Sequence, residues 1–293
     1  LSGGAINSPQ LLMLSGVGPA AHLRDVGIQV VADLPGVGRN LQDHLMAVAA
    51  HVCTQPVSMM TVEKPINLLR YLIFKRGPLT SNIAETTGFV RTSNDLPRPD
   101  IQLMFAPLYY LNHGFTRPDG HGFSVGAVLL HPRSRGTISL RSADPQAAPV
   151  IQPNFLDHPD DLATLVKGLR LCRSIAADGQ AFAQYRGEEY CPGREAVSDE
   201  ALAVHVRATA EAVYHPVGTC KMGDDAIAVV DGELRVHGLD GLRVVDASIM
   251  PTITSGNTYA PTLLIAEKAA EMILSTSSSA RVLPIREPAS AVA

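Results

Sequence analysis

The segment spanning residues 242–274 constrains the fold of this chain more than any other. It begins with a short apolar run at residues 242–245, rich in β-branched residues and bounded by Gly241 and Asp246, which predicts a buried strand. A loop rich in Pro, Ser, Gly and Asn follows, and Pro261 then suits the first turn of a helix built from strong helix formers. A carboxylate at a strand end and a helix N-terminus one loop away suit a cofactor with hydroxyl groups and a polar, potentially anionic edge.

A second segment, VYHPVGTCKMG, presents His215 directly before Pro216. The residue before a proline is biased towards extended backbone, so this imidazole is held in a constrained loop. An imidazole titrates near neutral pH, which makes His215 a candidate proton acceptor. Taken alone, a loop histidine is more often structural, and Asn257 after Gly256 is more often a turn residue.

The pattern of the remaining sequence predicts further elements. Short β-rich runs at residues 89–92, 100–106, 123–131 and 136–142, separated by turn residues, favour an antiparallel sheet. One helix is predicted to begin at Pro159 and another after Ser198. Near the amino terminus we expect a helix that begins at Ser8-Pro9, a second over residues 19–26 and a strand over residues 28–32. The Gly36-Val37-Gly38 sequence lacks a third glycine and is assigned to a loop.

Composition excludes several classes of protein. The 293 residues are 46% hydrophobic and 18% charged, which describes an ordinary globular protein with enough material for a sizeable core. A formal net charge of −4 argues against a nucleic-acid partner. The four cysteines are far apart and form no CxxC pair, so neither a disulfide framework nor a metal site is expected. No apolar run approaches the length of a transmembrane segment, and we expect a cytoplasmic location, either free or peripheral at the inner membrane.

Five segments of the chain carry a family resemblance. In order they are GAINSPQLLMLSGVG (residues 4–18), NLQDH (40–44), HPRSRGTISLRSADP (131–145), YHPVGTCKMG (214–223) and VVDASIMPTITSGNTYAPTLLIAEKAAEMI (244–273). Together they span nearly the whole chain, and their sequences and order resemble the glucose–methanol–choline (GMC) family of flavin-dependent oxidoreductases.

The resemblance implies a mixed fold, α/β and α+β, in which the remnant of a Rossmann-like FAD-binding domain joins a substrate domain built on an antiparallel sheet with helices. It assigns residues 1–44 and 213–280 to the FAD domain, 45–212 to the substrate domain and 281–293 to a tail. The glycine-rich nucleotide-binding half of the family would precede Leu1. We therefore interpret the chain as the carboxy-terminal portion of a longer enzyme and expect it to bind little flavin by itself.

The resemblance also implies site residues. It gives His215 the role of base and Asn257 the role of hydrogen-bond partner to the substrate oxygen. The carboxylate of Asp246 would accept hydrogen bonds from cofactor hydroxyls, although without the surrounding motif a helix or loop cap would be the favoured interpretation. Glu85 is a weaker substrate-contact candidate, because a carboxylate in a polar loop is usually just solvated. The residues expected to contact FAD are Asp246, Ala247, Gly256, Asn257, Thr258, Pro261 and Thr262.

The implied reaction is FAD-dependent oxidation of a primary, aliphatic alcohol to the aldehyde by proton abstraction and hydride transfer. Choline is the alternative substrate, but a quaternary ammonium favours aromatic faces, and the chain has no Trp, 7 Tyr and 7 Phe. The electron acceptor, whether a quinone, a soluble carrier or oxygen, stays open. An interpretation from another class also stays open, namely an inactive fragment or a non-catalytic subunit that binds a partner.

Overall fold

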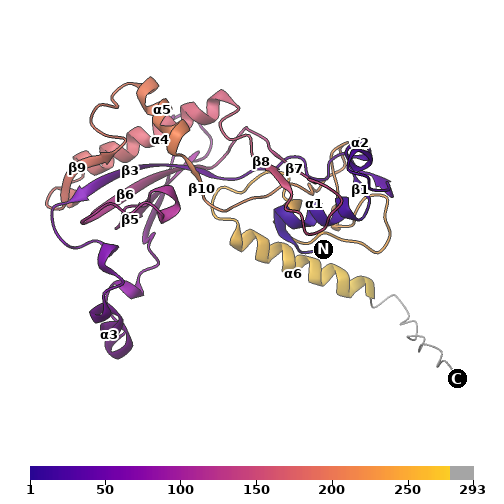
Figure 1. Ribbon diagram of the computed structural model, residues 1–293, viewed down its shortest axis with the longest axis horizontal. Coiled ribbons are helices and arrows are strands. Elements are labelled where there is room, and N and C mark those ends of the chain that lie inside the picture. Colours follow the sequence, from indigo (N-terminus) through magenta and orange to yellow (C-terminus); the bar gives the residue numbers. More distant parts are fainter. Residues whose placement is uncertain (278–293) are drawn as a thin grey trace.

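An antiparallel six-stranded sheet forms the larger lobe of the computed structural model, which describes residues 1–277 (Figure 1). Together with the helices that pack on it, this sheet confirms the predicted mixed fold class. In order across the sheet the strands are β10 (Glu211–Ala212), β3 (Leu45–Cys53), β6 (Gly122–Leu129), β5 (Ile101–Ala106) and β4 (Thr86–Val90), and β9 (Arg186–Cys191) also pairs with β3.

The two faces of this sheet have different neighbours. Side chains along a strand alternate between its faces, so Leu45, Ala47 and Ala49 of β3 enter a hydrophobic core that helices cover. Met46 and Val48 point to the opposite face and join a smaller apolar cluster. The strand β3 therefore divides a packing face from a face that is available for a site.

Two helices, α4 (Pro159–Asp178) and α5 (Asp199–Thr209), cover the packing face (Figure 1). Both begin where the sequence predicts, and the Ser198 side chain caps α5 by accepting a hydrogen bond from an amide in its first turn. Gly168 lets α4 approach the sheet closely, because a Cβ atom there would lie 2.8 Å from the Cβ of Ala127.

The smaller lobe surrounds a second hydrophobic core. Its residues come from the first part of the chain, from Ile138 and Leu140 in the middle, and from residues 220–269. Its elements are α1 (Gly4–Leu14), β1 (Val17–Gly18), α2 (Ala20–Asp25), β2 (Ala32–Asp33), β7 (Thr137–Ser139), β8 (Val150–Gln152), the 3₁₀ helix η5 (Ala247–Ile249) and α6 (Tyr259–Ser277). The backbone N–H of Val245 donates to the carbonyl of Leu1 at 2.7 Å, so the start of the chain lies against residues 242–246.

Two elements differ from the sequence prediction, because most of their apolar residues pack against the core from loops. Residues 242–245 do not form a strand, and only an isolated bridge joins Arg243 to Arg235. Val244 is nevertheless fully buried in the smaller lobe. Of residues 28–32, only Ala32 enters a strand, β2, which pairs with β1. Ile28, Val30 and Val245 are partly buried against the core, and such packing does not require a neighbouring strand.

The run at residues 136–142 lies in a different sheet from the one predicted. Its strand β7 pairs with β8 and not with the six-stranded sheet. Ile138 and Leu140 consequently belong to the core of the smaller lobe. The predicted domain division at residues 44 and 212 stays a prediction, and the predicted tail, residues 281–293, lies outside the described residues.

Several elements were not predicted. The central strand β3 is one of them, and α3 (Pro65–Phe74), which projects from the larger lobe, is another (Figure 1). Four short 3₁₀ helices were also not predicted: η1 (Met59–Thr61), η2 (Pro78–Thr80), η3 (Asn112–Gly114) and η4 (Gln180–Phe182).

Within residues 1–277, no helix combines the length and apolar character needed to cross a membrane.

The predicted start of the first helix is wrong, because α1 begins at Gly4 and contains Pro9 in its interior. Proline has no N–H, so the carbonyl of Ala5, four residues earlier, loses its helical partner. The hydroxyl of Thr219 replaces that donor with a hydrogen bond of 2.6 Å to the Ala5 oxygen. A distant loop therefore completes this helix.

We predict that Thr219→Val lowers the free energy of unfolding by about 1–3 kcal/mol, because it leaves the buried Ala5 carbonyl without a donor. In a Pro9→Ala background, the backbone amide restored by that substitution can bond the same carbonyl, and Thr219→Val should cost clearly less. Urea unfolding of the four chains of this double-mutant cycle measures the difference. Equal costs in both backgrounds would contradict the proposed replacement.

Candidate active site

The candidate site is an apolar cavity of about 180 Å³ on the open face of the larger sheet. Its walls come from side chains of β3, β5 and β6 that point away from α4 and α5, and from four loop segments, of which those with His215 and Asn257 bring polar groups. The residues that line it are Met46, Val48, Ile83, Ala84, Met104, Ala106, Tyr110, Ser124, Gly126, Val213, Tyr214, His215 and Asn257.

His215 and Asn257 meet at the wall of this cavity, although 42 residues separate them in the chain. The side-chain amide nitrogen of Asn257 lies 3.2 Å from Nε2 of His215. Its oxygen accepts a hydrogen bond of 3.4 Å from the buried Gln102 on β5. Because Gln102 fixes which end of the amide is the acceptor, the N–H₂ group of Asn257 points at the imidazole.

A second histidine, His44, lies behind His215 and is fully buried. The Nδ1 atoms of the two rings are 2.9 Å apart, and the ring planes meet at 89°. The Nε2 atom of His44 lies 3.1 Å from the carbonyl oxygen of Thr254. A carbonyl can only accept, so Nε2 of His44 carries the hydrogen and its Nδ1 is an acceptor.

This contact decides which nitrogen of His215 is free. Because Nδ1 of His44 accepts, Nδ1 of His215 must carry the hydrogen that it donates. The Nε2 atom of His215 is then an unprotonated acceptor that faces the cavity beside the Asn257 amide. The arrangement can accept a proton at one defined atom.

Burial keeps both rings neutral. It lowers the pKa of His44 to about 4, with a further decrease from the nearby His215. Burial also lowers the pKa of His215 below the usual value of histidine. Asp43, the neighbour of His44, accepts a hydrogen bond of 2.8 Å from the His215 backbone amide, and burial raises its pKa to about 6. The loop that carries His215 is therefore fixed by its backbone as well as by its ring.

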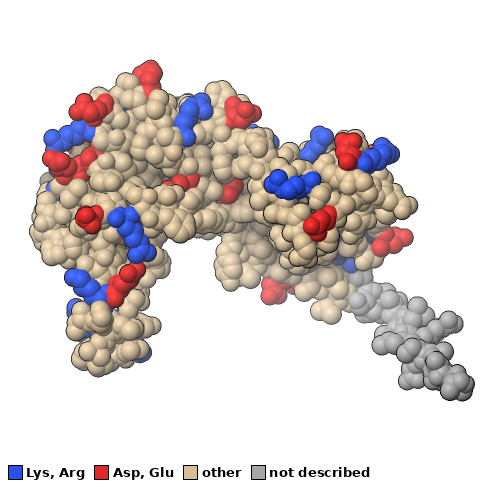
Figure 2. Space-filling view, viewed as in Figure 1, with Lys and Arg blue, Asp and Glu red and all other residues tan. Residues whose placement is uncertain are grey.

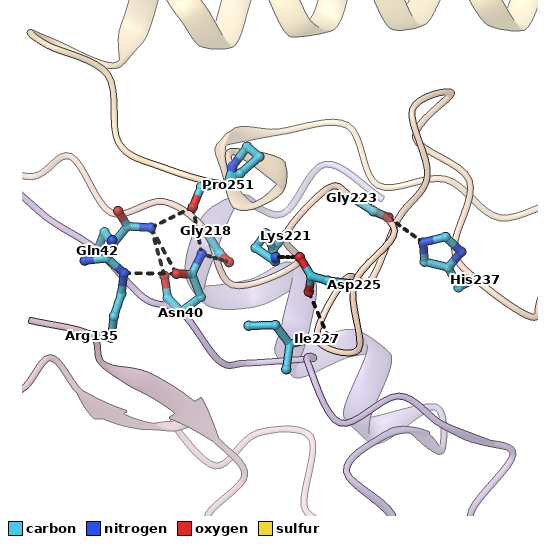
Figure 3. A network of polar contacts seen from close by, with 10 residues as sticks. All are labelled: Asn40, Gln42, Arg135, Gly218, Lys221, Gly223, Asp225, Ile227, His237 and Pro251. Carbon is cyan, nitrogen blue, oxygen red and sulfur yellow. Dashed lines mark hydrogen bonds and ion pairs between the residues drawn. The ribbon is translucent and has the colours of Figure 1, made fainter. Parts of the chain in front are cut away.

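A network of side-chain amides bonds to the loops at Gly218 and Pro251 (Figure 3). Asn40 donates to the carbonyls of Gly218 and Pro251, each at 3.2 Å, and Gln42 donates to the Pro251 carbonyl at the same distance. Arg135 donates to the Asn40 side-chain oxygen at 3.1 Å. Gly218 has φ of +92°, and a Cβ atom there would lie 2.5 Å from the backbone carbonyl oxygen of Asn40, so only glycine fits.

Asp246 lies in the smaller lobe, where it is buried and bonded within the protein. Its Oδ2 atom accepts from the Gly4 amide at 3.0 Å and from the Ser8 hydroxyl at 2.5 Å. Its Oδ1 atom accepts from the Ser248 amide at 2.8 Å and so caps η5. A carboxylate has about four lone-pair positions, so roughly one remains for another donor.

The other predicted cofactor contacts lie along η5 and the start of α6. Thr258 is buried and its carbonyl accepts from both the amide and the hydroxyl of Thr262, at 3.0 and 2.7 Å. Ala247 begins η5, Gly256 has φ of +152°, and Pro261 stands in the first turn of α6, as predicted. The N-terminus of α6 is exposed at Tyr259.

Glu85 does not line the cavity of His215 and Asn257. It lies with η2 at a neighbouring cavity, and its role as a substrate contact stays a prediction. Sequence reasoning also missed four residues that position the pair: Asp43, His44, Gln102 and Thr254. The NLQDH segment was noted as part of the family resemblance, but no spacing in the sequence connects His44 with His215.

Comparison with known proteins identifies the family of this chain. Two family models described as GMC oxidoreductase match the chain, over residues 1–46 and 132–266. An alcohol dehydrogenase [acceptor] of Pseudomonas putida is 46% identical over 280 residues, which cover 94% of this chain and 50% of that protein. An oxygen-dependent choline dehydrogenase of Brucella ovis is 43% identical over 290 residues, covering 96% of this chain and 52% of that protein.

A solved structure has the same fold. A formate oxidase of Aspergillus oryzae superimposes with a TM-score of 0.88 at 28% identity, covering 95% of this chain and 54% of that protein. The chain belongs to the GMC oxidoreductase family, which confirms the resemblance. It spans about half the length of the curated relatives that it matches.

We predict that His44 stays neutral down to a pH of about 4, because burial opposes its charge. Histidine carbon–proton NMR spectra of the 293-residue chain across pH measure this, with His44→Asn used to assign its resonance among the ten histidines. His215, whose pKa is also lowered by burial, should titrate below the usual histidine range. A midpoint for His44 near that of an exposed histidine would contradict the buried, neutral ring.

Proposed function

We propose that this chain carries the substrate pocket and the proton acceptor of an FAD-dependent enzyme that oxidises a primary, aliphatic alcohol to the aldehyde. One observation carries the proposal. An unprotonated imidazole nitrogen and an amide N–H₂ group lie 3.2 Å apart at the wall of an apolar cavity. A hydroxyl group both donates and accepts a hydrogen bond, so an alcohol oxygen beside this pair can donate to the imidazole nitrogen and accept from the amide.

The proton of the substrate hydroxyl passes to Nε2 of His215. The resulting imidazolium keeps its Nδ1 hydrogen bond to His44, whose neutral ring accepts it. Asn257 donates to the substrate oxygen and stabilises the negative charge that develops there as the proton leaves. Apolar side chains around the cavity exclude water, which strengthens these interactions.

FAD, when bound, supplies the chemistry of accepting the hydride from the α-carbon of the alcohol. The residues of this chain suit such a cofactor. Asp246 keeps a free lone-pair position for a hydroxyl group, and the exposed start of α6 offers the positive end of a helix dipole to an anionic edge. Ala247, Gly256, Thr258, Pro261 and Thr262 would hold the cofactor between these two features.

The cavity lining favours an aliphatic substrate. Met46, Met104 and Ile83 provide flexible apolar surface, which suits an alkyl chain. Among the described residues that line the cavity, none carries a carboxylate that could pair with a quaternary ammonium. The Pseudomonas putida relative is named as an alcohol dehydrogenase, which agrees with this preference.

Choline is the second candidate. Tyr110 and Tyr214 line the cavity, and aromatic faces attract quaternary ammonium groups. The relative from Brucella ovis is named as a choline dehydrogenase. Steady-state rates with a straight-chain primary alcohol and with choline decide between the two: the proposal requires the higher kcat/KM for the aliphatic alcohol.

We predict that His215→Ala lowers the rate of flavin reduction by alcohol by roughly 10²–10⁴-fold, the usual contribution of a positioned base. Asn257→Ala should cost less, because it removes orientation and one hydrogen bond but leaves the proton acceptor. Both are measured by stopped-flow absorbance in a chimera that joins this chain to the part of the Pseudomonas putida relative that it does not cover. Val204→Ala, an exposed change on α5, serves as the control. Near-normal reduction in His215→Ala would remove that residue from the mechanism.

We predict a further dependence of this rate on pH. A protonated imidazole has no lone pair, so the rate should fall as pH decreases through the pKa of His215, which burial places below 6.5, the usual value. The rate should be constant above that midpoint until other groups titrate. In His215→Ala the midpoint should disappear. The same midpoint in His215→Ala would contradict the role of this imidazole.

A further inference from the structure

Helix α3 (Pro65–Phe74) exposes an unusual amount of apolar surface. Six of its ten residues are large apolar side chains with exposed fractions between 51% and 65%. They are Ile66, Leu68, Leu69, Leu72, Ile73 and Phe74. Single exposed apolar residues are ordinary, but a contiguous group on one projecting helix indicates an interaction site.

The orientation of α3 is the reverse of that in an ordinary surface helix. A helix on a globular protein turns its apolar face to the core. In α3 the buried residue is Asn67, whose side chain donates to the carbonyl of Thr61 at 2.8 Å. Leu69 and Ile73 lie one turn apart on the side away from Asn67. The polar side of α3 thus holds it to the body, and the apolar side faces outwards.

The charge around this face is positive. Lys64, Arg70, Lys75 and Arg76 lie on α3 or directly beside it. The one acidic residue between residues 56 and 84 is Glu63, which forms an ion pair of 2.9 Å with Arg117. The whole chain has a formal net charge of −4, so the excess of positive charge at α3 is opposite in sign to the net charge of the chain. In Figure 2 the projection at the lower left is mainly tan, with blue and red side chains near its base.

An apolar face bordered by Lys and Arg fits the surface of an anionic phospholipid bilayer. Apolar side chains enter the boundary between headgroups and acyl chains, and basic side chains bind the phosphates. An acidic protein partner would satisfy the charges but would not require six exposed apolar side chains on one short helix. The chain that follows α3 also leads to Ile83 and Ala84 at the wall of the candidate site.

We propose that α3 docks this protein on the surface of anionic membranes. The helix lies in the plane of the interface and does not span it. The proposal does not depend on the proposed function, because it concerns only the surface of α3.

Binding of the 293-residue chain to vesicles tests the proposal. The probes are vesicles of phosphatidylglycerol and phosphatidylcholine in equal parts, and vesicles of phosphatidylcholine alone. Sedimentation should show binding to the anionic vesicles that weakens with salt. The double variant Arg70→Gln, Arg76→Gln should bind roughly 5-fold more weakly for each charge removed. The double variant Leu69→Gln, Ile73→Gln should lose most of its binding.

A matched control comes from α6, where Leu263 and Leu264 are 50% and 62% exposed but Glu267 and Glu271 follow them on the same helix. Changing both leucines to Gln should leave vesicle binding unchanged. Circular dichroism shows whether each variant is folded. Equal binding to both kinds of vesicle, or unchanged binding of the Leu69→Gln, Ile73→Gln variant, would overturn the proposal. Dimers that this variant abolishes, without vesicle binding by the original chain, would identify a second copy as the occupant and also overturn it.

Discussion

The structure depends most on the short segment of residues 40–44, which connects the two lobes and bonds to three distant loops. Asn40 and Gln42 fix the loops at Gly218 and Pro251, and His44 fixes the ring of His215. These bonds lie between two separate hydrophobic cores. Neither core could orient an imidazole to within a hydrogen-bond length, because apolar packing has no directional preference. The cores supply stability, and this polar junction supplies the geometry.

Successive side chains of a strand point to opposite faces of the six-stranded sheet, so one face can pack against helices while the other lines a cavity. One face of β3 and β6 joins the core under α4 and α5, and the other lines the candidate cavity. The cavity side carries small residues such as Gly126, where a Cβ atom would lie 2.6 Å from the sulfur of Met46. Space for a ligand therefore comes from small side chains on strands whose opposite face is tightly packed.

Helices with caps and periodic apolar stripes could be predicted from sequence, and β3 could not. Pro159 and Ser198 mark the starts of α4 and α5 because local chemistry determines a helix start. The sequence of β3, LMAVAAHVC, is rich in alanine and is buried on both faces over most of its length, so it shows neither alternation nor strong β propensity. Pro9 led to a wrong prediction of where α1 begins. The cost of a proline inside α1 is offset by Thr219, which bonds to α1 across 214 residues of the chain.

The site residues show the same distinction between local sequence signals and long-range contacts. His215 and Asn257 could be proposed because each stands in a distinctive local segment, whereas His44 acts through a contact across 171 residues that exists only in the folded chain. Yet His44 determines which nitrogen of His215 is free. If burial did not lower its pKa from 6.5 to about 4, His44 would become protonated as the pH falls through 6.5, and a protonated His44 would donate from both nitrogens, so that Nδ1 of His215 would have to accept. The hydrogen of His215 would then move to Nε2, and the nitrogen facing the cavity could no longer accept a proton. The burial of one histidine thus sets the chemistry of the other.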